Sequence, residues 1–346
     1  MLGNNRNFKW SFVGNPQITD YLEKKIKSGN AGGSYIFNGP DNFGKTGLAL
    51  NFAQILLCDN LNKEGNIPCG VCHSCRQFLH QNEENDAAHG DLHLIKKEKD
   101  KRDINIKQIR EFIKILSMSS FLGKYKIGII KHAEFLNKEA ANALLKTLEE
   151  PRKDVVIILI TNDFEHLPRT IASRSQIFNF YPLKADDIYD YLVYNYKVPR
   201  SKAKHLARLS LGRPALALKF LEDEDFFEKY KKHVLLFLDL KKNSLEKRIS
   251  MLDDLFSISK NEKVKIREVF RVLEVWQGIM RDWIFMEFSH FNLIQHEIFL
   301  EKLEEAKKFY SLEEILKLAS FFKEAFENLK ANVNPKLVLE ELVIKI

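Results

Sequence analysis

The four cysteines of this 346-residue chain, Cys58, Cys69, Cys72 and Cys75, lie close together in the sequence. Their spacing, C-x10-C-x2-C-x2-C, allows tight turns that bring neighbouring thiolates to one side of a metal ion. Four thiolates fill a tetrahedral shell and leave no open position, so residues 58–75 are predicted to form a structural Zn²⁺ module. The alternatives are disulfides, which a reducing compartment disfavours, and an iron–sulfur cluster, whose usual spacings differ.

The residues around the cysteines are interpreted as surface. Three histidines lie nearby, His73, His80 and His89, but a site of four thiolates does not need them as ligands. The segment 83–103 is rich in charged and polar residues and is predicted to be a surface loop. On this interpretation the chemistry of the stretch rests on the cysteines alone.

A glycine-containing segment just upstream, G-P-D-N-F-G-K-T at residues 39–46, has the composition of a phosphate-binding loop. A β-prone run at 34–38 precedes it, and apolar residues at helical spacing follow it at 47–57. Strand, loop and helix are the context that such a loop requires, because its backbone N–H groups and the helix N-terminus bind phosphate oxygens. The expected ligand is ATP or ADP with Mg²⁺.

The candidate nucleotide-binding residues are Gly39, Asn42, Gly44, Lys45 and Thr46. The ammonium group of Lys45 is expected on the β and γ phosphates, and the Thr46 hydroxyl on Mg²⁺. Many such loops carry a third glycine where this chain has Asn42. Asparagine accepts a positive φ more readily than most residues, so the loop remains compatible with binding.

The acids that a phosphate-loop ATPase uses are not at their expected place. The strand predicted at 126–130 is followed by Lys131, His132, Ala133 and Glu134. Hydrolysis needs an acidic residue at the end of this strand to hold Mg²⁺, and usually a second carboxylate that activates water. A protonated lysine cannot coordinate the metal, and Glu134 is expected to flank the next helix, outside the site. The chain is therefore predicted to bind a nucleotide and to hydrolyse it poorly.

The elements that position these residues predict an α/β fold. The segment 137–151 has helical apolar spacing and ends at a proline, and 155–160 reads as a buried strand. Residues 183–222 are predicted to be helical, and 223–346 almost wholly so. The prediction is a phosphate-loop domain with a parallel sheet and the inserted zinc module at 1–182, a small helical domain at 183–222, and an all-α domain at 223–346.

The bulk composition is that of a cytoplasmic protein of two or three domains. Apolar residues make up 45% and charged residues 29% of the chain, and the formal net charge is +7. This basic balance is compatible with proximity to DNA and indicates nothing stronger. The polar first residues predict no signal peptide, and the aliphatic run at 155–160 is too short to span a membrane.

Residues 140–151, A-A-N-A-L-L-K-T-L-E-E-P, closely resemble the signature of bacterial clamp-loader AAA+ subunits. Asn162, after the strand, resembles the sensor 1 position of that family, and I-A-S-R-S-Q at 171–176 resembles its Ser-Arg-Cys motif, with Ser175 for the cysteine. The zinc module, G-N-P-Q at 14–17 and N-V-N-P-K-L at 332–337 are similar to the delta-prime family of DNA polymerase III subunits.

The resemblance implies roles for the three domains and for two arginines. Residues 1–182 would be the AAA+ nucleotide-binding domain, 183–222 its helical lid and 223–346 the collar that holds a ring of subunits together. Arg174 would act in trans, as an arginine finger on the ATP of the neighbouring subunit. Arg213 lies near the sensor 2 region.

The function that the resemblance implies is that of a clamp-loader subunit, which helps to load the sliding clamp onto primed DNA. Its partners would be gamma/tau and delta subunits, the clamp, and DNA within the assembly, without a membrane. The holoenzyme is a DNA-directed DNA polymerase, and this chain is expected not to be catalytic itself. The alternatives are an active gamma/tau-type ATPase subunit and a zinc-stabilised DNA-binding protein with a vestigial phosphate loop.

Overall fold

The computed structural model describes residues 6–78, 89–98, 101, 103–121, 125–257 and 262–346. It divides into two compact units. The first unit is Met1–Asp187 with Arg213–Ala215, and the second is Ile188–Gly212 with Leu216–Ile346. Each unit has its own hydrophobic core, and the three predicted domain boundaries remain a prediction.

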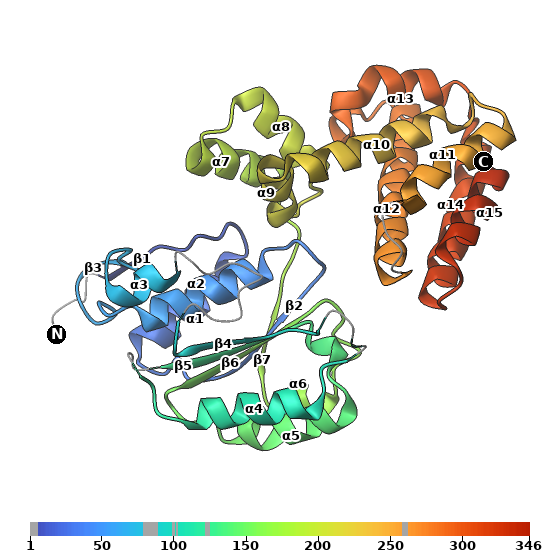
Figure 1. Ribbon diagram of the computed structural model, residues 1–346. Helices are drawn as coiled ribbons and strands as arrows, with labels where there is room; N and C mark the ends of the chain where they lie inside the picture. Colours follow the sequence, from blue (N-terminus) through green and yellow to red (C-terminus); the bar gives the residue numbers. More distant parts are fainter. Residues whose placement is uncertain (1–5, 79–88, 99–100, 102, 122–124, 258–261) are drawn as a thin grey trace. The chain divides into compact units, whose positions relative to one another are not determined.

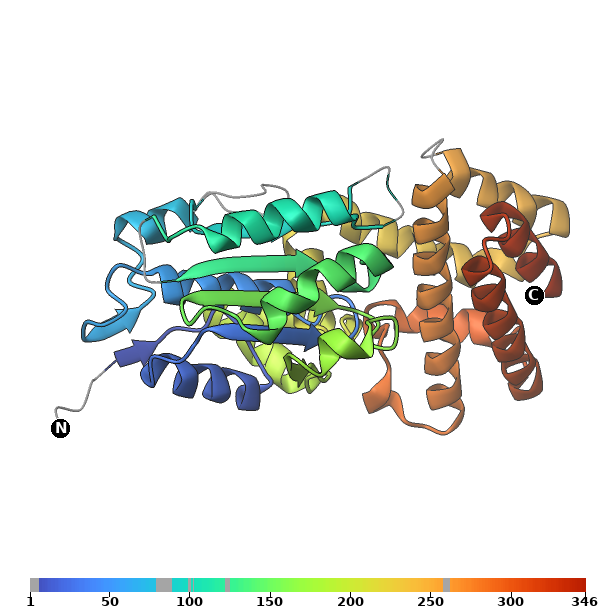
Figure 2. The same cartoon turned by 90° about the horizontal axis from the view of Figure 1, so that it is seen from below.

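The first unit is built on a parallel five-stranded sheet in the order β4-β5-β6-β2-β7. Helices α1 and α2 cover one face, and α4, α5 and α6 cover the other (Figures 1 and 2). The strands of the sheet are β2 (Gly33–Asn38), β4 (Leu92–Ile95), β5 (Lys126–Lys131), β6 (Val155–Thr161) and β7 (Gln176–Asn179). The helices are α1 (Pro16–Lys27), α2 (Lys45–Leu57), α4 (Ile106–Ser117), α5 (Lys138–Glu149) and α6 (Arg169–Ala172).

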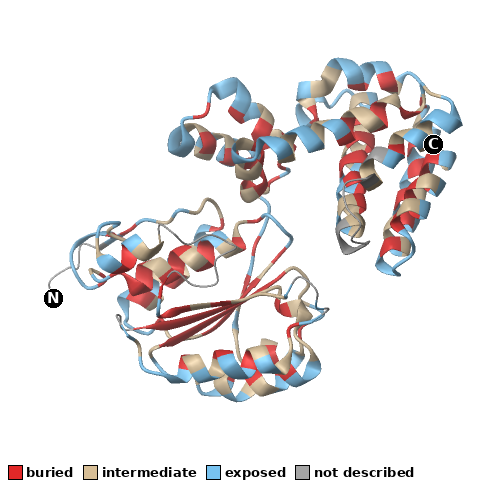
Figure 3. Ribbon diagram, viewed as in Figure 1, coloured by how far each residue is buried: buried red, intermediate tan, exposed pale blue. Residues whose placement is uncertain are grey.

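The apolar runs of the sequence explain this arrangement. All seven residues of β6 are buried, as expected for a continuous aliphatic strand with helices on both faces (Figure 3). The Asn137 side chain caps α5 by accepting the N–H of Ala140 at 2.8 Å, and the helix ends before Pro151. The predicted strands and this helix are confirmed.

A smaller pair of strands joins the start of the chain to the cysteine module. Strand β1 (Arg6–Phe8) runs parallel to β3 (Gly65–Ile67), which lies between α2 and the short helix α3 (His73–Phe78). The Lys9 N–H extends the pairing by donating to Ile67 O at 2.8 Å. The module is thereby attached at both sides, by α2 and by β1.

The prediction of a surface loop over 83–103 is wrong for β4. Leu92 and Leu94 are buried against the core, and β4 forms an edge of the sheet beside β5. Residues 83–88, 99–100 and 102 lie outside the described part of the chain.

The second unit is helical, as predicted for the C-terminal part. Its centre is aromatic: Trp276 and Trp283 are fully buried, and Phe237 stacks on both with ring centroids 5.1 and 5.5 Å away. The α-helices here and before it are α7 (Ala185–Tyr196), α8 (Arg200–Leu209), α9 (Pro214–Glu222), α10 (Glu224–Leu240), α11 (Leu245–Ser257), α12 (Glu262–Glu287), α13 (Leu300–Lys307), α14 (Leu312–Lys330) and α15 (Pro335–Lys345). The 3₁₀ turns are η2 (Phe291–Leu293) and η3 (Glu297–Phe299).

The predicted fold class is therefore confirmed: an α/β unit with a parallel sheet is followed by a helical C-terminal part. Among the described residues, none of the helices has the length and apolar composition needed to cross a bilayer.

Candidate functional site

The phosphate loop joins the end of β2 to the start of α2. Three of its residues have a positive φ angle. Gly39, Asn42 and Gly44 have φ values of 148°, 66° and 82°. A Cβ on Gly39 would lie 3.0 Å from the carbonyl oxygen of Phe180, and one on Gly44 would lie 2.9 Å from the Phe12 ring. Both glycines are thus required by backbone conformation and by close packing.

The ammonium group of Lys45 is enclosed by acceptors. It donates to the carbonyl oxygens of Gly39 and Pro40, the latter at 2.6 Å, and to Asn162 Oδ1 at 2.8 Å. An ammonium has three N–H donors, so these contacts use all of them. Since two acceptors belong to the loop itself, the Asn162 side chain is the partner that a phosphate group can replace without unfolding the loop.

Burial also affects the pKa of this lysine. The Lys45 side chain is 5% exposed. Burial lowers its pKa to about 8, against the opposing effect of the Asp41 and Glu134 carboxylates. A bound phosphate would supply the negative charge that keeps the ammonium protonated.

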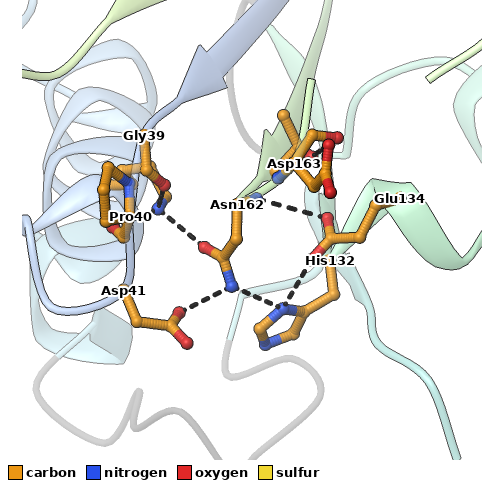
Figure 4. Close-up of polar contacts among 9 residues, drawn as sticks. Gly39, Pro40, Asp41, His132, Glu134, Asn162 and Asp163 are labelled. Atoms are coloured by element: carbon orange, nitrogen blue, oxygen red, sulfur yellow. Dashed lines mark hydrogen bonds and ion pairs between the residues drawn. The ribbon is translucent and has the colours of Figure 1, made fainter. Parts of the chain in front are cut away.

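Asn162, which directly follows β6, connects the loop to the end of β5. Its Nδ2 donates to Asp41 Oδ1 at 2.7 Å and lies 3.4 Å from His132 Nδ1. Its backbone N–H donates to Glu134 Oε2 at 3.4 Å (Figure 4). The structure therefore brings the predicted sensor residue and the predicted phosphate-binding lysine together.

The expectation that Glu134 lies outside the site is wrong. His132 adopts a left-handed conformation with φ 55°, and the chain turns at once into the 3₁₀ turn η1 (Ala133–Phe135). This turn keeps Glu134 at the same edge of the sheet as the phosphate loop, with a side chain only 9% exposed. Burial raises its pKa, but hydrogen bonds from His132, Thr161 and its own backbone outweigh this effect and lower the pKa, which favours the carboxylate.

Asp41 and Glu134 are two further members of the site, and neither was predicted from the sequence. Asp41 is inside the loop, and Glu134 follows β5 by three residues, so both positions carried a signal: carboxyl ends of parallel strands share one edge of a sheet. Lys131 ends β5, where a metal-binding acid was expected. Thr46 is the second residue of α2 and is half-buried.

Arg213 belongs to the same compact unit as the phosphate loop. The N–H of Ala215, two residues on, donates to the carbonyl oxygen of Asn42 at 3.1 Å. The segment that carries Arg213 therefore contacts the loop directly, and its sensor role stays a prediction.

The four cysteines form the compact cluster that their spacing predicts. Their sulfur atoms all lie within 4.8 Å of one another, and the cysteines are free thiols. The backbone N–H groups of Cys69, Cys72 and Cys75 donate to the sulfurs of Cys58, Cys69 and Cys72 at 3.5, 3.4 and 3.4 Å. Gly70 has φ 74°, which lets the chain turn between two ligands.

The chemistry of this donor set fits a tetrahedral Zn²⁺ ion. Burial raises the pKa of Cys58 to about 11 and raises that of Cys75 beyond its usual range. Burial also acts to raise the pKa of Cys69, but N–H groups and neighbouring thiols outweigh it and lower the pKa to about 6. Buried thiols of this kind ionise together only when a cation balances their charge.

The histidines around the cluster differ from one another. His73 is exposed, as predicted, and His80 lies outside the described residues. His89 is only 1% exposed, so its interpretation as a surface residue is wrong. Its Nδ1 accepts the N–H of Asp91 at 3.0 Å at the entry to β4, which is a structural role.

Arg174 lies away from the phosphate loop of its own chain. It follows α6, and its carbonyl oxygen accepts the Ser34 hydroxyl at 2.6 Å, near the start of β2. The phosphate loop begins at the other end of β2, at Gly39. A strand rises about 3.3 Å per residue, so roughly 17 Å separates the two ends. The structure does not bring Arg174 and Lys45 together.

Comparison with known proteins agrees with this architecture. Residues 14–184 match the family described as DNA polymerase III, delta subunit. The chain is 31% identical to DNA polymerase III subunit delta' of Bacillus subtilis over 64% of each chain. It is 32% identical to DNA polymerase III subunit tau of Escherichia coli over 51% of this chain and 26% of that one.

Each match therefore spans less than two thirds of the relative's length. Among solved structures, a DNA polymerase III gamma subunit-related protein from Thermotoga maritima has a TM-score of 0.50 at 18% identity. That alignment covers 94% of this chain and 97% of the other. At this identity the likeness concerns the fold alone.

Proposed function

We propose that the chain is a clamp-loader subunit of the DNA polymerase III delta-prime type, which helps to load the sliding clamp onto primed DNA; the family match over residues 14–184 and the similarity to delta' subunits support this. Its proposed partners are gamma/tau and delta subunits, the clamp, and primed DNA as part of the assembly. The proposed contribution of this chain to the ATPase cycle is Arg174, offered in trans to the nucleotide of an adjacent subunit.

The position of Arg174 at the opposite end of β2 from its own phosphate loop is the observation that carries this proposal. A side chain anchored there cannot reach a nucleotide on Lys45 of the same chain. Its guanidinium can act only on a nucleotide brought by another subunit. An arginine that reaches a γ-phosphate stabilises the charge that develops during phosphoryl transfer.

We infer that the site of the chain itself binds ATP or ADP and hydrolyses ATP slowly. The loop conformation at Gly39, Asn42 and Gly44 and the location of Lys45 support binding. Thr46 in the first turn of α2 would offer its hydroxyl to Mg²⁺. Lys131 at the end of β5 supports slow turnover, because it supplies a cation where the metal needs a carboxylate.

The thiol cluster is proposed to hold Zn²⁺ with a structural role. Cys58 closes α2 and Cys75 lies in α3, so one ion held by all four thiols would join two helices and β3 between them. Four protein ligands leave no position for substrate or water.

The proposal is tested by Arg174→Ala in a loader reconstituted with its cognate subunits. We expect DNA-stimulated ATP hydrolysis to slow by about 10³-fold or more, the range known for arginine fingers, while assembly on size-exclusion chromatography is unchanged. Arg169→Ala, which removes an exposed arginine at the start of α6, is the matched control. Unchanged turnover by Arg174→Ala would refute the finger.

An active ATPase subunit of the gamma/tau type is the second candidate. It is favoured by the 32% identity to the tau subunit and by the ionised Glu134 next to Asn162. The two candidates differ in the isolated chain: a delta-prime subunit would hydrolyse ATP slowly or not at all, whereas a gamma/tau-type subunit would hydrolyse it steadily. Steady hydrolysis by the purified chain with Mg²⁺, abolished by Glu134→Gln, would make the gamma/tau type the better description.

A further inference from the structure

We infer that Glu149 is a positioning residue for Arg174, which holds the guanidinium in the orientation from which it meets the neighbouring nucleotide. The inference rests on the proposed function of Arg174 and assigns a role to a residue that the proposal does not use. Glu149 is the last residue of α5, and Arg174 follows α6 on the same side of the sheet.

The guanidinium is held from two directions. Its Nε donates to Glu149 Oε1 at 2.7 Å, and Nη2 pairs with the same oxygen. From the other side, Nη1 donates to the carbonyl oxygen of Thr170 at 2.9 Å, within α6, and lies 3.4 Å from Ser173 Oγ. The arginine backbone is fixed as well, because Ser34 binds its carbonyl oxygen. Both ends of this long side chain are therefore restrained.

The restraint comes from rigid elements. Ala140, Ala141, Leu144 and Leu148 of α5 are buried in the core beneath the sheet, so the last turn of the helix has a fixed place. Glu149 is carried on that turn. A group held by a packed helix keeps its geometry better than one held by a loop.

The contacts leave the arginine able to act. Three of the five guanidinium N–H groups are enough for the bonds to Glu149 and Thr170, so the remaining donors on Nη1 and Nη2 can turn to phosphate oxygens. The Arg174 side chain is 32% exposed and that of Glu149 47%, so the pair is reachable from solvent. Exposed ion pairs contribute little to stability, and the value of this one lies in restricting the rotamers of Arg174 before the neighbour arrives.

The chemistry of the acceptor allows a sharp test. Glutamine keeps an oxygen that can accept from Nε and Nη2, but it has no charge, whereas alanine removes the acceptor. Positioning by hydrogen bonds therefore predicts that the glutamine variant works and the alanine variant fails. Glu149→Gln should retain roughly half or more of the wild-type turnover, and Glu149→Ala should lose about tenfold.

The experiment measures kcat and KM for DNA-stimulated ATP hydrolysis by the reconstituted loader with Glu149→Ala, Glu149→Gln, Arg174→Ala and the Glu149→Ala/Arg174→Ala double variant. We expect the loss in Glu149→Ala to fall on kcat, with KM within about twofold of wild type. The double variant should match Arg174→Ala alone, because Glu149 acts only through the arginine. Glu150→Ala removes the adjacent exposed carboxylate and is the control.

The outcomes separate the two levels of the argument. If Arg174→Ala slows ATP turnover while Glu149→Ala turns over at the wild-type rate or faster, the positioning role is overturned and the proposed function stays intact. Glu149→Gln as slow as Glu149→Ala, or a double variant slower than Arg174→Ala, also overturns it. Wild-type turnover by Arg174→Ala overturns both. Circular dichroism melting and assembly by size exclusion establish that each variant is folded.

Discussion

At the scale of single residues, the charge of Lys45 is the feature with the clearest chemical consequence. Its ammonium is buried and donates to three acceptors within the site. Burial lowers its pKa to about 8, so the free protein loses this proton at a pH where an exposed lysine would keep it. A nucleotide phosphate brings the opposite charge and restores the proton.

Nucleotide affinity should therefore fall as the pH rises above about 8. Below the lowered pKa the free and the bound protein both carry the proton, so affinity is insensitive to this group. Above it, binding must take up a proton, and the Kd should rise by up to about tenfold per pH unit. Calorimetric titration of ADP into the isolated chain between about pH 7 and 9.5 measures this. Proton uptake on the alkaline side appears as a dependence of the binding enthalpy on the buffer, and a constant Kd over the whole range would contradict the prediction.

Motif spacing predicted which residues belong to the site better than it predicted the contacts between them. Lys45 and Asn162 could each be assigned from the sequence, because a glycine loop and the end of a buried strand are readable patterns. Glu134 follows β5 closely enough to be a candidate for the site, but its contact with Asn162 depends on one left-handed residue, His132, which sequence does not reveal. His89 was misjudged because burial of a polar residue depends on long-range packing.

At the scale of elements, the segment 294–297 contacts both α8 and α12 within the second unit. Gln295 Nε2 donates to the carbonyl oxygen of Leu209 at 3.0 Å, at the end of α8. Glu297 pairs with Lys204 at 3.0 Å and with Arg208 at 2.8 Å, both on α8. These contacts pack α8 against Gln295 and the 3₁₀ turn η3.

The buried side of the same segment is fastened by a charged group on α12. The Asp282 carboxylate accepts the backbone N–H groups of Gln295 and His296 at 3.0 and 2.8 Å, and His296 Nδ1 lies 2.7 Å from it. His296 Nε2 in turn lies 2.7 Å from the Tyr230 hydroxyl on α10. A satisfied buried network of this kind specifies one arrangement of the helices it joins.

Gly278 of α12 is what lets the segment approach so closely. A Cβ there would lie 2.7 Å from Gln295 Oε1 and 3.1 Å from His296 Cε1. Gly278→Ala should therefore destabilise the second unit by about 1–2 kcal/mol, because displacing Gln295 costs more than the gain in helix propensity. Urea unfolding followed by the fluorescence of the buried Trp276 and Trp283, in a Trp10→Phe background, measures the loss.

The control is Gly47→Ala in α2, where a Cβ meets nothing within 4 Å; its unfolding is followed by far-UV circular dichroism, because Trp276 and Trp283 report on the second unit only. Propensity alone acts there, so the substitution should stabilise the first unit by up to about 1 kcal/mol. If Gly278→Ala were as stabilising as Gly47→Ala, the segment 294–297 would not need the glycine.

Elements with a strong local pattern were predictable, and those defined by distant pairing were not. The helix that became α5 had a cap, an apolar stripe and a terminating proline within the segment itself. Strand β4 offers only two inward leucines inside a highly charged stretch, and its identity comes from pairing with β5. The β1–β3 pair likewise joins residues far apart in the sequence.

At the scale of the whole molecule, the cysteine module belongs to one core only. Cys58 and Cys75 are part of the core formed by α1, α2 and one face of the sheet, and Cys69 and Cys72 pack against it. The second unit has a separate core with its own tryptophans. Two independent cores permit two separable unfolding transitions.

Removing the metal should therefore destabilise the first unit and spare the second. A strong chelator, or Cys75→Ser, is expected to lower the Tm of the first unit by roughly 5–10 °C. The transition reported by Trp276 and Trp283 should not move. Differential scanning calorimetry, together with a thermal melt followed by tryptophan fluorescence, separates the two transitions. Metal analysis of the purified chain identifies the ion. Equal shifts of both transitions would contradict a module that acts through one core.

The place of β2 in the sheet bears on how the chain is made. β2 is the earliest strand of the five in the sequence, yet it lies between β6 and β7. Roughly 120 residues must follow it before its first neighbour exists, which takes on the order of 6–25 s at ordinary rates of synthesis. During this time the apolar residues Tyr35, Ile36 and Phe37 have no sheet to join. The strand that leads into the phosphate loop thus leaves the ribosome early and pairs with its neighbours late. Its apolar residues stay exposed in the meantime, which makes the nascent chain a natural client for chaperones.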